Sequence, residues 1–119
     1  MEFMHARVRR HDGVILVAEL NGQVVGFVTV LRRVERSEPD DPAPWHSFVS
    51  ELSVAPSARG RGVGEALMQH AEQLARLADS PELRLGVVEA NEGARRFYSR
   101  LGFHTASRVL AKSLIKRAR

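Results

Sequence analysis

The sequence predicts a mixed α/β (α+β) fold with a mostly antiparallel central sheet and one parallel strand pair. Residues 14–20 and 23–31 are β-rich runs joined by Asn21-Gly22, and Asn-Gly is the strongest short hairpin signal because both turn residues need a positive φ. A strand, a helix and another strand follow between residues 47 and 89, and such a unit makes its strands parallel with a right-handed connection. The 119 residues suffice for one domain with a single core.

The composition is that of a globular protein, with 44% hydrophobic residues and no apolar run near the ~20 residues that cross a bilayer. The first residues do not resemble a secretory signal, so we expect a cytoplasmic protein without membrane association. The absence of cysteine excludes thiolate metal sites and a cysteinyl intermediate, and we expect no metal. The net charge of +4 and the pI near 10.6 are compatible with nucleic-acid binding, but no aromatic residues lie among the basic ones, so the composition does not favour that role.

Two segments outside the hairpin have little periodicity. Residues 1–12 are expected to be a short lead-in. Residues 32–45 carry several acidic residues together with Pro39, Pro42 and Pro44, which neither a helix nor a central strand tolerates. We expect a long acidic loop here, which either attracts a cationic amine acceptor or is simply a solvated run of charge.

The run from Ser47 to Val54 alternates as a strand does. The expected alternation puts one group of residues on one face, namely Phe48, Leu52 and Val54, and another on the opposite face, namely Val49, Glu51 and Ser53. Half-burial of the Glu51 carboxylate in mid-strand could make it a usable general base.

Helical spacing begins at Val63. The expected apolar stripe contains Val63, Leu67, Ala71, Leu74 and Leu77 or Ala78, with Glu65, Gln69, Glu72 and Arg76 facing outward. Residues 79–81 end this helix, and residues 83–89 form the next predicted strand. Asn91 is the expected N-cap of a second helix over residues 92–101, which Gly102 and Phe103 terminate. Residues 104–114 could add a last strand before a basic tail at 112–119.

The turn before the first helix has the chemistry of a phosphate site. Gly60, Gly62 and Gly64 allow an anion to approach the main chain closely, the helix start directs free N–H groups at it, and Arg59 and Arg61 add planar donors. A P-loop needs a Lys and a Ser or Thr after its last glycine, which Glu65 and Ala66 do not supply. A dinucleotide fingerprint needs a glycine at position 65, where the chain has Glu65.

The run Arg59-Gly60-Arg61-Gly62-Val63-Gly64, after Leu-Ser-Val-Ala-Pro and before an amphipathic helix, resembles the coenzyme A pyrophosphate loop of the GNAT superfamily of N-acetyltransferases. Asn91 followed by Tyr98 and Leu101-Gly102-Phe103 resembles the second signature of that superfamily. The resemblance covers residues 14–114. It implies a GNAT-like sheet whose parallel strands splay apart at the cofactor site, with helices on both faces. It also implies transfer of an acetyl group from acetyl-CoA to a primary amine, by direct attack in a ternary complex.

Site residues follow from the resemblance position by position. It assigns cofactor binding to Leu52, Ser53, Val54, Arg59, Gly60, Arg61, Gly62, Val63, Gly64, Glu65 and Asn91. Tyr98 corresponds to the general acid, although it could simply pack on the apolar stripe, and an N-cap alone would explain Asn91. Some relatives carry a glutamate as base where this chain has Gly86. Glu51, acting through water, is the best remaining base, with Glu89 as a second choice, and a salt-bridged strand residue would explain Glu51 equally well.

The sequence departs from the superfamily before the hairpin. Members usually begin with a strand and two helices that form one wall of the acceptor site, whereas about a dozen residues precede the hairpin here. A minimal version, a late start and a partner subunit that completes the pocket all remain open, and we expect a homodimer. The acceptor, a small-molecule or peptide amine, is not specified. A non-catalytic module that binds acyl-CoA or a partner is the alternative function.

Overall fold

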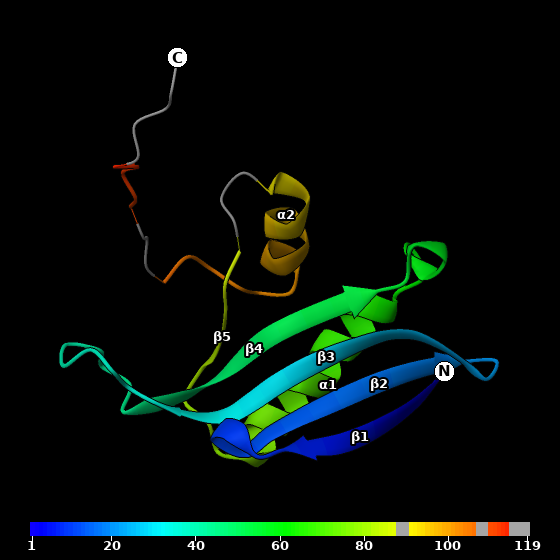
Figure 1. The fold of residues 1–119 in the computed structure, drawn as a ribbon, viewed down its shortest axis with the longest axis horizontal. Helices are drawn as coiled ribbons and strands as arrows, with labels where there is room; N and C mark the ends of the chain where they lie inside the picture. Colours follow the sequence, from blue (N-terminus) through cyan, green and yellow to red (C-terminus); the bar gives the residue numbers. More distant parts are fainter. Residues whose placement is uncertain (88–90, 107–109, 115–119) are drawn as a thin grey trace. The chain divides into compact units, whose positions relative to one another are not determined.

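The computed structural model of the chain describes residues 1–87, 91–106 and 110–114. It contains two compact units, Met1–Gly86 and Val87–Arg119. In the first unit a sheet carries helix α1 on one face, behind the strands in Figure 1. The second unit contains helix α2. In the part of the chain that the structure describes, no helix is long and apolar enough to cross a membrane.

The described residues of the first unit form a five-stranded sheet in the order β1-β2-β3-β4-β5. The strands are β1 (Glu2–Val8), β2 (Gly13–Leu20), β3 (Gln23–Glu35), β4 (Trp45–Val54) and β5 (Leu83–Leu85). The helical segments are η1 (Arg10–Asp12), η2 (Pro56–Ala58), α1 (Val63–Leu77) and α2 (Glu92–Arg100). Neighbouring strands are antiparallel except for β4 and β5, which are parallel. The predicted mixed fold with one parallel pair is confirmed.

The hairpin between β2 and β3 forms as the sequence predicts. Asn21 and Gly22 have φ values of 53° and 78°, which match the positive values that a two-residue hairpin turn requires.

Two boundaries differ from the expectation. The expected lead-in contains β1, which pairs with β2 from Glu2 opposite Glu19 to Val8 opposite Gly13; the free edge of β2 organises a segment whose own pattern is weak. The acidic loop is shorter than expected, because β3 continues to Glu35 and β4 starts at Trp45. The three prolines are thereby confined to the loop, residues 36–44.

Helix α1 packs one stripe of side chains against the sheet. The buried residues are Val63, Leu67, Met68, Ala71 and Ala75, and they meet a sheet face that includes Val28 and Val30. The predicted outward residues are all exposed. Leu77 is not part of the stripe and is 77% exposed, because it lies two positions after Ala75 and therefore about 200° around the helix axis from it.

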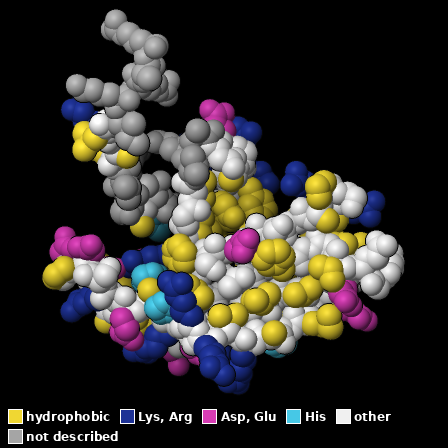
Figure 2. Space-filling view, in the orientation of Figure 1, with side chains coloured by type: hydrophobic (Ala, Val, Ile, Leu, Met, Phe, Trp, Pro, Cys, Tyr) yellow, Lys and Arg dark blue, Asp and Glu magenta, His cyan; other side chains and the backbone are white. Residues whose placement is uncertain are grey.

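Strand β4 contains a bulge that reverses half of its expected alternation. Thr29 pairs with Glu51, whereas the next residue, Val30, pairs with Val49, so Ser50 is the extra residue. Val49 is 5% exposed and shares the α1 face with Leu52. The predicted placement of Phe48 and Val49 was therefore wrong: Phe48 lies on the face opposite α1. Figure 2 looks onto that face, where hydrophobic side chains recur across the strands.

The second unit contains α2 with both of its predicted end signals. The Asn91 side chain accepts a hydrogen bond from the Ala94 N–H at 3.0 Å. At the other end the Phe103 N–H donates to the Tyr98 carbonyl at 3.0 Å, after Gly102 with φ of 93°. These bonds are those of an N-cap and of a Schellman-type stop.

The predicted strands after α1 are only partly observed. The strand expected over 83–89 ends at Leu85, and residues 88–90 lie outside the described residues. The strand considered for 104–114 is not present in residues 104–106 and 110–114, and residues 107–109 lie outside the description. The last five residues of the expected basic tail, 115–119, also lie outside it.

Candidate functional site

The strongest candidate site is the turn that joins β4 to α1. After the short helix η2, Gly60 and Gly62 have φ values of 77° and 78°, and Gly62 is the N-cap of the 15-residue helix α1. A side chain rarely adopts such φ values, which explains the two glycines. Because the first amides of a helix have no partner within it, the N–H groups of Val63, Gly64 and Glu65 remain for an external acceptor.

The charge at this turn also favours an anion. Arg59 and Arg61 are both exposed, and neither forms an ion pair with another residue in the described part of the chain. They lie at the positive end of the α1 dipole. Apart from the adjacent residues of the chain, no described residue has an atom within 4 Å of where a Cβ would stand on Gly60 or Gly62, so the main chain is accessible. The arrangement fits a phosphate group.

Gly26, which the sequence reasoning did not assign to the site, brings α1 close to the sheet. A Cβ on this residue would lie 2.7 Å from the Ser53 carbonyl oxygen, 3.2 Å from Leu67 Cδ1 and 3.3 Å from Val63 Cγ1. The absence of a side chain at Gly26 therefore allows the first two turns of α1 to pack closely against β3 and β4. A glycine inside an apolar strand run is the signal that could have identified it.

Strand β4 extends past its parallel partner toward this turn. Its pairing with β5 ends at Val49 opposite Leu85, while β4 continues to Val54 opposite β3. Leu52 and Val54 are half-buried and Ser53 is exposed. Among the described residues, none pairs with the β5-facing edge of β4 after Val49. This edge, next to the arginine-glycine turn, can form main-chain hydrogen bonds to an extended ligand.

The candidate base residues are less well supported. Glu51 is exposed, so the half-burial expected for its side chain is not observed. The salt-bridge alternative is not supported either, because no ion pair joins Glu51 to another described residue. Gly86 is exposed directly after β5, and Glu89 lies outside the described residues.

The other two predicted site residues belong to the second unit. Asn91 is a confirmed N-cap, and its cofactor role stays a prediction. Tyr98 is half-buried between Phe97 and Phe103, with ring centroids 5.1 Å and 5.8 Å away. Burial raises the pKa of its hydroxyl above the ordinary 10.0, so the phenol remains protonated at neutral pH and can donate a proton.

Known proteins resemble this chain along most of its length. The model of the Acetyltransferase (GNAT) family matches residues 1–103. A peptidyl-lysine N-acetyltransferase of Escherichia coli is 34% identical over 88 residues, which are 74% of this chain and 48% of that protein. A 5-NmdU N-acetyltransferase of Pseudomonas phage PaMx11 is 35% identical over 100 residues, 84% of this chain and 64% of the relative.

An uncharacterised N-acetyltransferase of Methanocaldococcus jannaschii is 34% identical over 100 residues, 81% of this chain and 41% of the relative. The chain thus spans between 41% and 64% of the length of these three relatives.

Solved structures share the fold. The aminoglycoside N-acetyltransferase AAC(6')-Iy in complex with CoA has a TM-score of 0.74 at 21% identity, over 89% of this chain and 77% of that one. The BH1408 protein of Bacillus halodurans has a TM-score of 0.76 at 21% identity, over 86% of this chain and 66% of that one. The family match and the sequence identities with the curated relatives lead to one conclusion: this chain belongs to the Acetyltransferase (GNAT) family.

Proposed function

We propose that the chain is an acetyl-CoA-dependent N-acetyltransferase that transfers the acetyl group to a primary amine by direct attack in a ternary complex. The observation that carries the proposal is the turn before α1, where Gly60 and Gly62 have positive φ and two exposed arginines lie directly before a helix N-terminus. Family membership supports it. The proposal includes a cytoplasmic location and a homodimer, and no metal takes part in it.

The turn would bind the pyrophosphate of coenzyme A through main-chain N–H groups and the guanidinium groups of Arg59 and Arg61. The pantetheine arm would then follow the free edge of β4. The proposed contacts are Leu52, Ser53, Val54, Arg59, Gly60, Arg61, Gly62, Val63, Gly64 and Glu65, with Asn91 as an additional contact. Most of these contacts use the main chain, so backbone conformation matters more here than side-chain identity.

The transfer needs two proton movements. The acceptor would attack the carbonyl carbon of the thioester as a neutral amine, because only that form is nucleophilic. Glu51, through a water molecule, would accept the proton that the nitrogen loses as the new carbon–nitrogen bond forms. The carbon–sulfur bond then breaks. Tyr98 would donate its proton to the departing thiolate, because its hydroxyl, whose pKa burial raises above 10.0, is protonated at neutral pH. The exposed position of Glu51 suits contact with water.

The acceptor class is drawn from the relatives. The Escherichia coli relative is named for peptidyl lysine, the phage relative for 5-NmdU, and the structural neighbour AAC(6')-Iy for aminoglycosides. The proposed acceptor is therefore a primary amine on a small molecule or a peptide. The alternative is a module that binds acyl-CoA without catalysing transfer.

Tyr98→Phe separates the enzyme from the non-catalytic module. We expect free thiol release from acetyl-CoA over an amine panel in the wild type, and a fall in kcat of about 10²–10⁴-fold in the variant. Acetyl-CoA affinity by calorimetry should be unchanged, because the substitution removes only the proton donor. Tight binding by the wild type without turnover on any amine would support the module, and an equal kcat for both proteins would remove the acid role from Tyr98.

Asn91 has a capping role and a proposed cofactor role, which two substitutions can distinguish. Asn91→Ser keeps a good cap, whereas Asn91→Ala loses it and should destabilise the second unit by about 1 kcal/mol. If Asn91 also contacts the cofactor through its amide, Asn91→Ser will weaken acetyl-CoA binding while leaving Tm unchanged. If Asn91→Ser bound acetyl-CoA as tightly as the wild type, Asn91 would have the capping role alone.

A further inference from the structure

An ion-pair cluster connects the β3–β4 loop to β5. Arg84 Nη1 and Nη2 donate to Asp41 Oδ2 and Oδ1 at 2.8 Å and 2.9 Å, so the pair is bidentate. The Asp41 side chain is only 14% exposed, and it also accepts the Ala43 N–H at 3.0 Å. Arg84 binds Glu82 as well, at 2.7 Å. Residues 43 positions apart in the sequence are thus joined by partly buried, charge-assisted bonds, which salt screens less than surface pairs.

A second set of hydrogen bonds fixes the start of the same strand pair. The fully buried Ser47 donates its hydroxyl to the Arg32 carbonyl at 2.8 Å. Its N–H donates to the Ser80 hydroxyl at 3.0 Å and to the Glu82 carbonyl at 2.9 Å. These bonds connect β3, β4 and the segment before β5. None of these bonds involves the C-terminal end of β5. That end is fixed by the Arg84 side chain and by the pairing of β5 with β4, whose three residue pairs end at Val49 opposite Leu85.

We propose that Arg84 is a positioning residue for acyl transfer: through its bidentate pair with Asp41 it holds β5 in register with β4 and so fixes the point at which the two strands part. The inference rests on the proposed function, in which the thioester arm enters beyond that point. Arg84 sits one residue before the end of the pairing, opposite Phe48. Loss of the pair would let the parting point move along β4.

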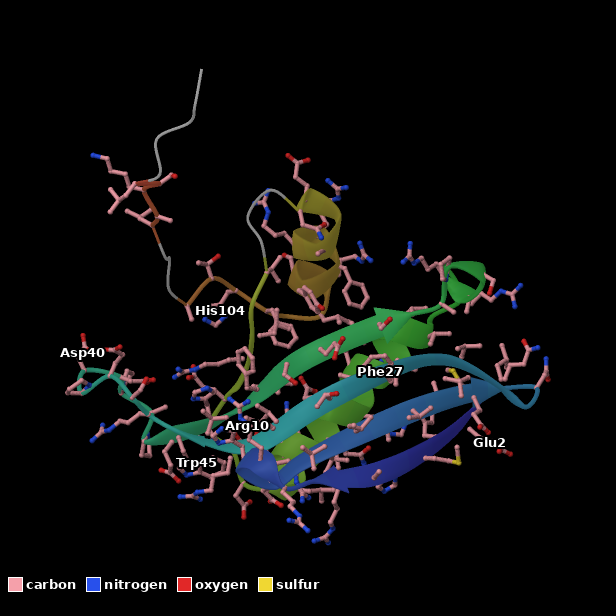
Figure 3. The ribbon with its side chains drawn as sticks, viewed as in Figure 1. Glu2, Arg10, Phe27, Asp40, Trp45 and His104 are labelled. Atoms are coloured by element: carbon pink, nitrogen blue, oxygen red, sulfur yellow. The ribbon has the colours of Figure 1, made fainter. Side chains whose placement is uncertain are left out.

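The cluster is far from the arginine-glycine turn. The β3–β4 loop, whose tip carries Asp40, lies at one end of the sheet, and the turn before α1 lies at the opposite end (Figures 1 and 3). The ten residues of β4 separate them, or roughly 33 Å of extended chain. Substitutions in the cluster should therefore alter the strand pair without altering the pyrophosphate site.

The pH dependence of the pair follows from the charge on Asp41. The Arg84 hydrogen bonds, and then the Ala43 N–H, hold the pKa of the Asp41 carboxyl at about 2, below its ordinary 3.8. A depressed folded-state pKa contributes stability that is present above pH 3.8 and lost as the pH falls toward 2. Asp41 and Arg84 are therefore both fully charged at any pH suited to acetyl transfer. Titration of this pair will not change the reaction rate near neutral pH.

His46 offers a spectroscopic probe of the cluster. Its Nδ1 is buried without a hydrogen-bond partner among the described residues. Burial lowers the pKa of His46, the Arg84 guanidinium lowers it further, and the carboxylates of Asp41 and Glu82 act in the opposite direction. Removal of Arg84 should therefore raise the pKa of His46, and removal of the Asp41 charge should lower it.

The test compares Arg84→Gln, Asp41→Asn and the double variant with Glu82→Gln as the matched control. Glu82→Gln removes a local partner of Arg84 and leaves the bond between loop and strand intact. We expect kcat to fall about 10–100-fold in the first two variants. Acetyl-CoA affinity should stay within about twofold of the wild type, because the pyrophosphate site is remote from the cluster. The double variant should be no worse than either single one. Glu82→Gln should keep wild-type kcat.

Two further measurements test the positioning role of Arg84 without an assay of enzymatic turnover. Amide hydrogen exchange over residues 47–49 and 83–86 should accelerate in Arg84→Gln and Asp41→Asn, and exchange over β2 and the first half of β3 should not. NMR titration should show the two opposite shifts of the His46 pKa. If the wild type itself releases no thiol, the proposed function fails while these two measurements still test the positioning of β5. Wild-type exchange in Arg84→Gln, or an equal effect of Glu82→Gln, would overturn the inference.

Discussion

Gly62→Val should weaken acetyl-CoA binding about 100-fold while leaving the protein folded. Gly62 has φ of 78°, and a side chain at this φ costs about 1–2 kcal/mol, so the turn is expected to rearrange and to turn the first amides of α1 away from the pyrophosphate. Losing two charge-assisted hydrogen bonds of roughly 1.5 kcal/mol each would lower the affinity about 100-fold. Isothermal calorimetry with acetyl-CoA measures this directly.

Gly22→Val is the matched control for this experiment. Gly22 has the same φ of 78° and the same open surroundings, but it belongs to the β2–β3 hairpin turn and not to the N-terminus of α1. The two variants should lose similar stability, and only Gly62→Val should lose affinity. Wild-type affinity in Gly62→Val would show that the main chain of this turn does not hold the pyrophosphate.

Gly26→Val should produce the largest loss of stability. Its Cβ alone would approach the Ser53 carbonyl oxygen to 2.7 Å, and neither β4 nor the first turn of α1 can yield without disturbing the core. Overpacking of this kind costs about 1–3 kcal/mol, which lowers Tm by roughly 4 °C per kcal/mol for a chain of this size. Thermal unfolding followed by circular dichroism would measure the change, and weaker acetyl-CoA binding should accompany it because α1 is displaced.

Gly86→Ala is the corresponding control. Gly86 lies after β5, and its φ is not positive. Apart from its two chain neighbours, no described residue has an atom within 4 Å of the place that a Cβ would take, so Tm should change by less than about 2 °C. If Gly26→Val were as stable as Gly86→Ala, the close packing of α1 on β3 would not be a constraint on this fold.

Local signals accounted for the parts of the fold that could be predicted. Asn21-Gly22 predicted a hairpin through its φ requirements, and Asn91 and Gly102 predicted the two ends of α2 through their hydrogen bonds. Gly60, Gly62 and Gly64 predicted a main chain that an anion can approach closely; Gly60 and Gly62 have positive φ, whereas Gly64 lies within α1 without one. In each case a few adjacent residues determine the conformation, so no knowledge of distant partners is needed.

Features that depend on distant partners could not be predicted. Strand β1 forms because the edge of β2 is available, and the sequence of residues 2–8 has no pattern that indicates this. The bond between Asp41 and Arg84 joins residues 43 positions apart, and nothing in either local sequence identifies the partner. The site prediction is affected in the same way: Glu51 was singled out for a half-burial that the neighbouring strands do not provide.

The extra residue in β4 divides that strand into two halves whose relative orientation depends on Ser50. Before it, Val49 faces α1; after it, Leu52 takes that side. If the same residues paired without the bulge, unbroken alternation from Val49 would turn Glu51 and Ser53 toward the helix and Leu52 away from it. One unpaired position thus keeps the Glu51 carboxylate out of the hydrophobic interior. It also allows the same strand to pack on the core with one face while its edge faces the proposed cofactor arm.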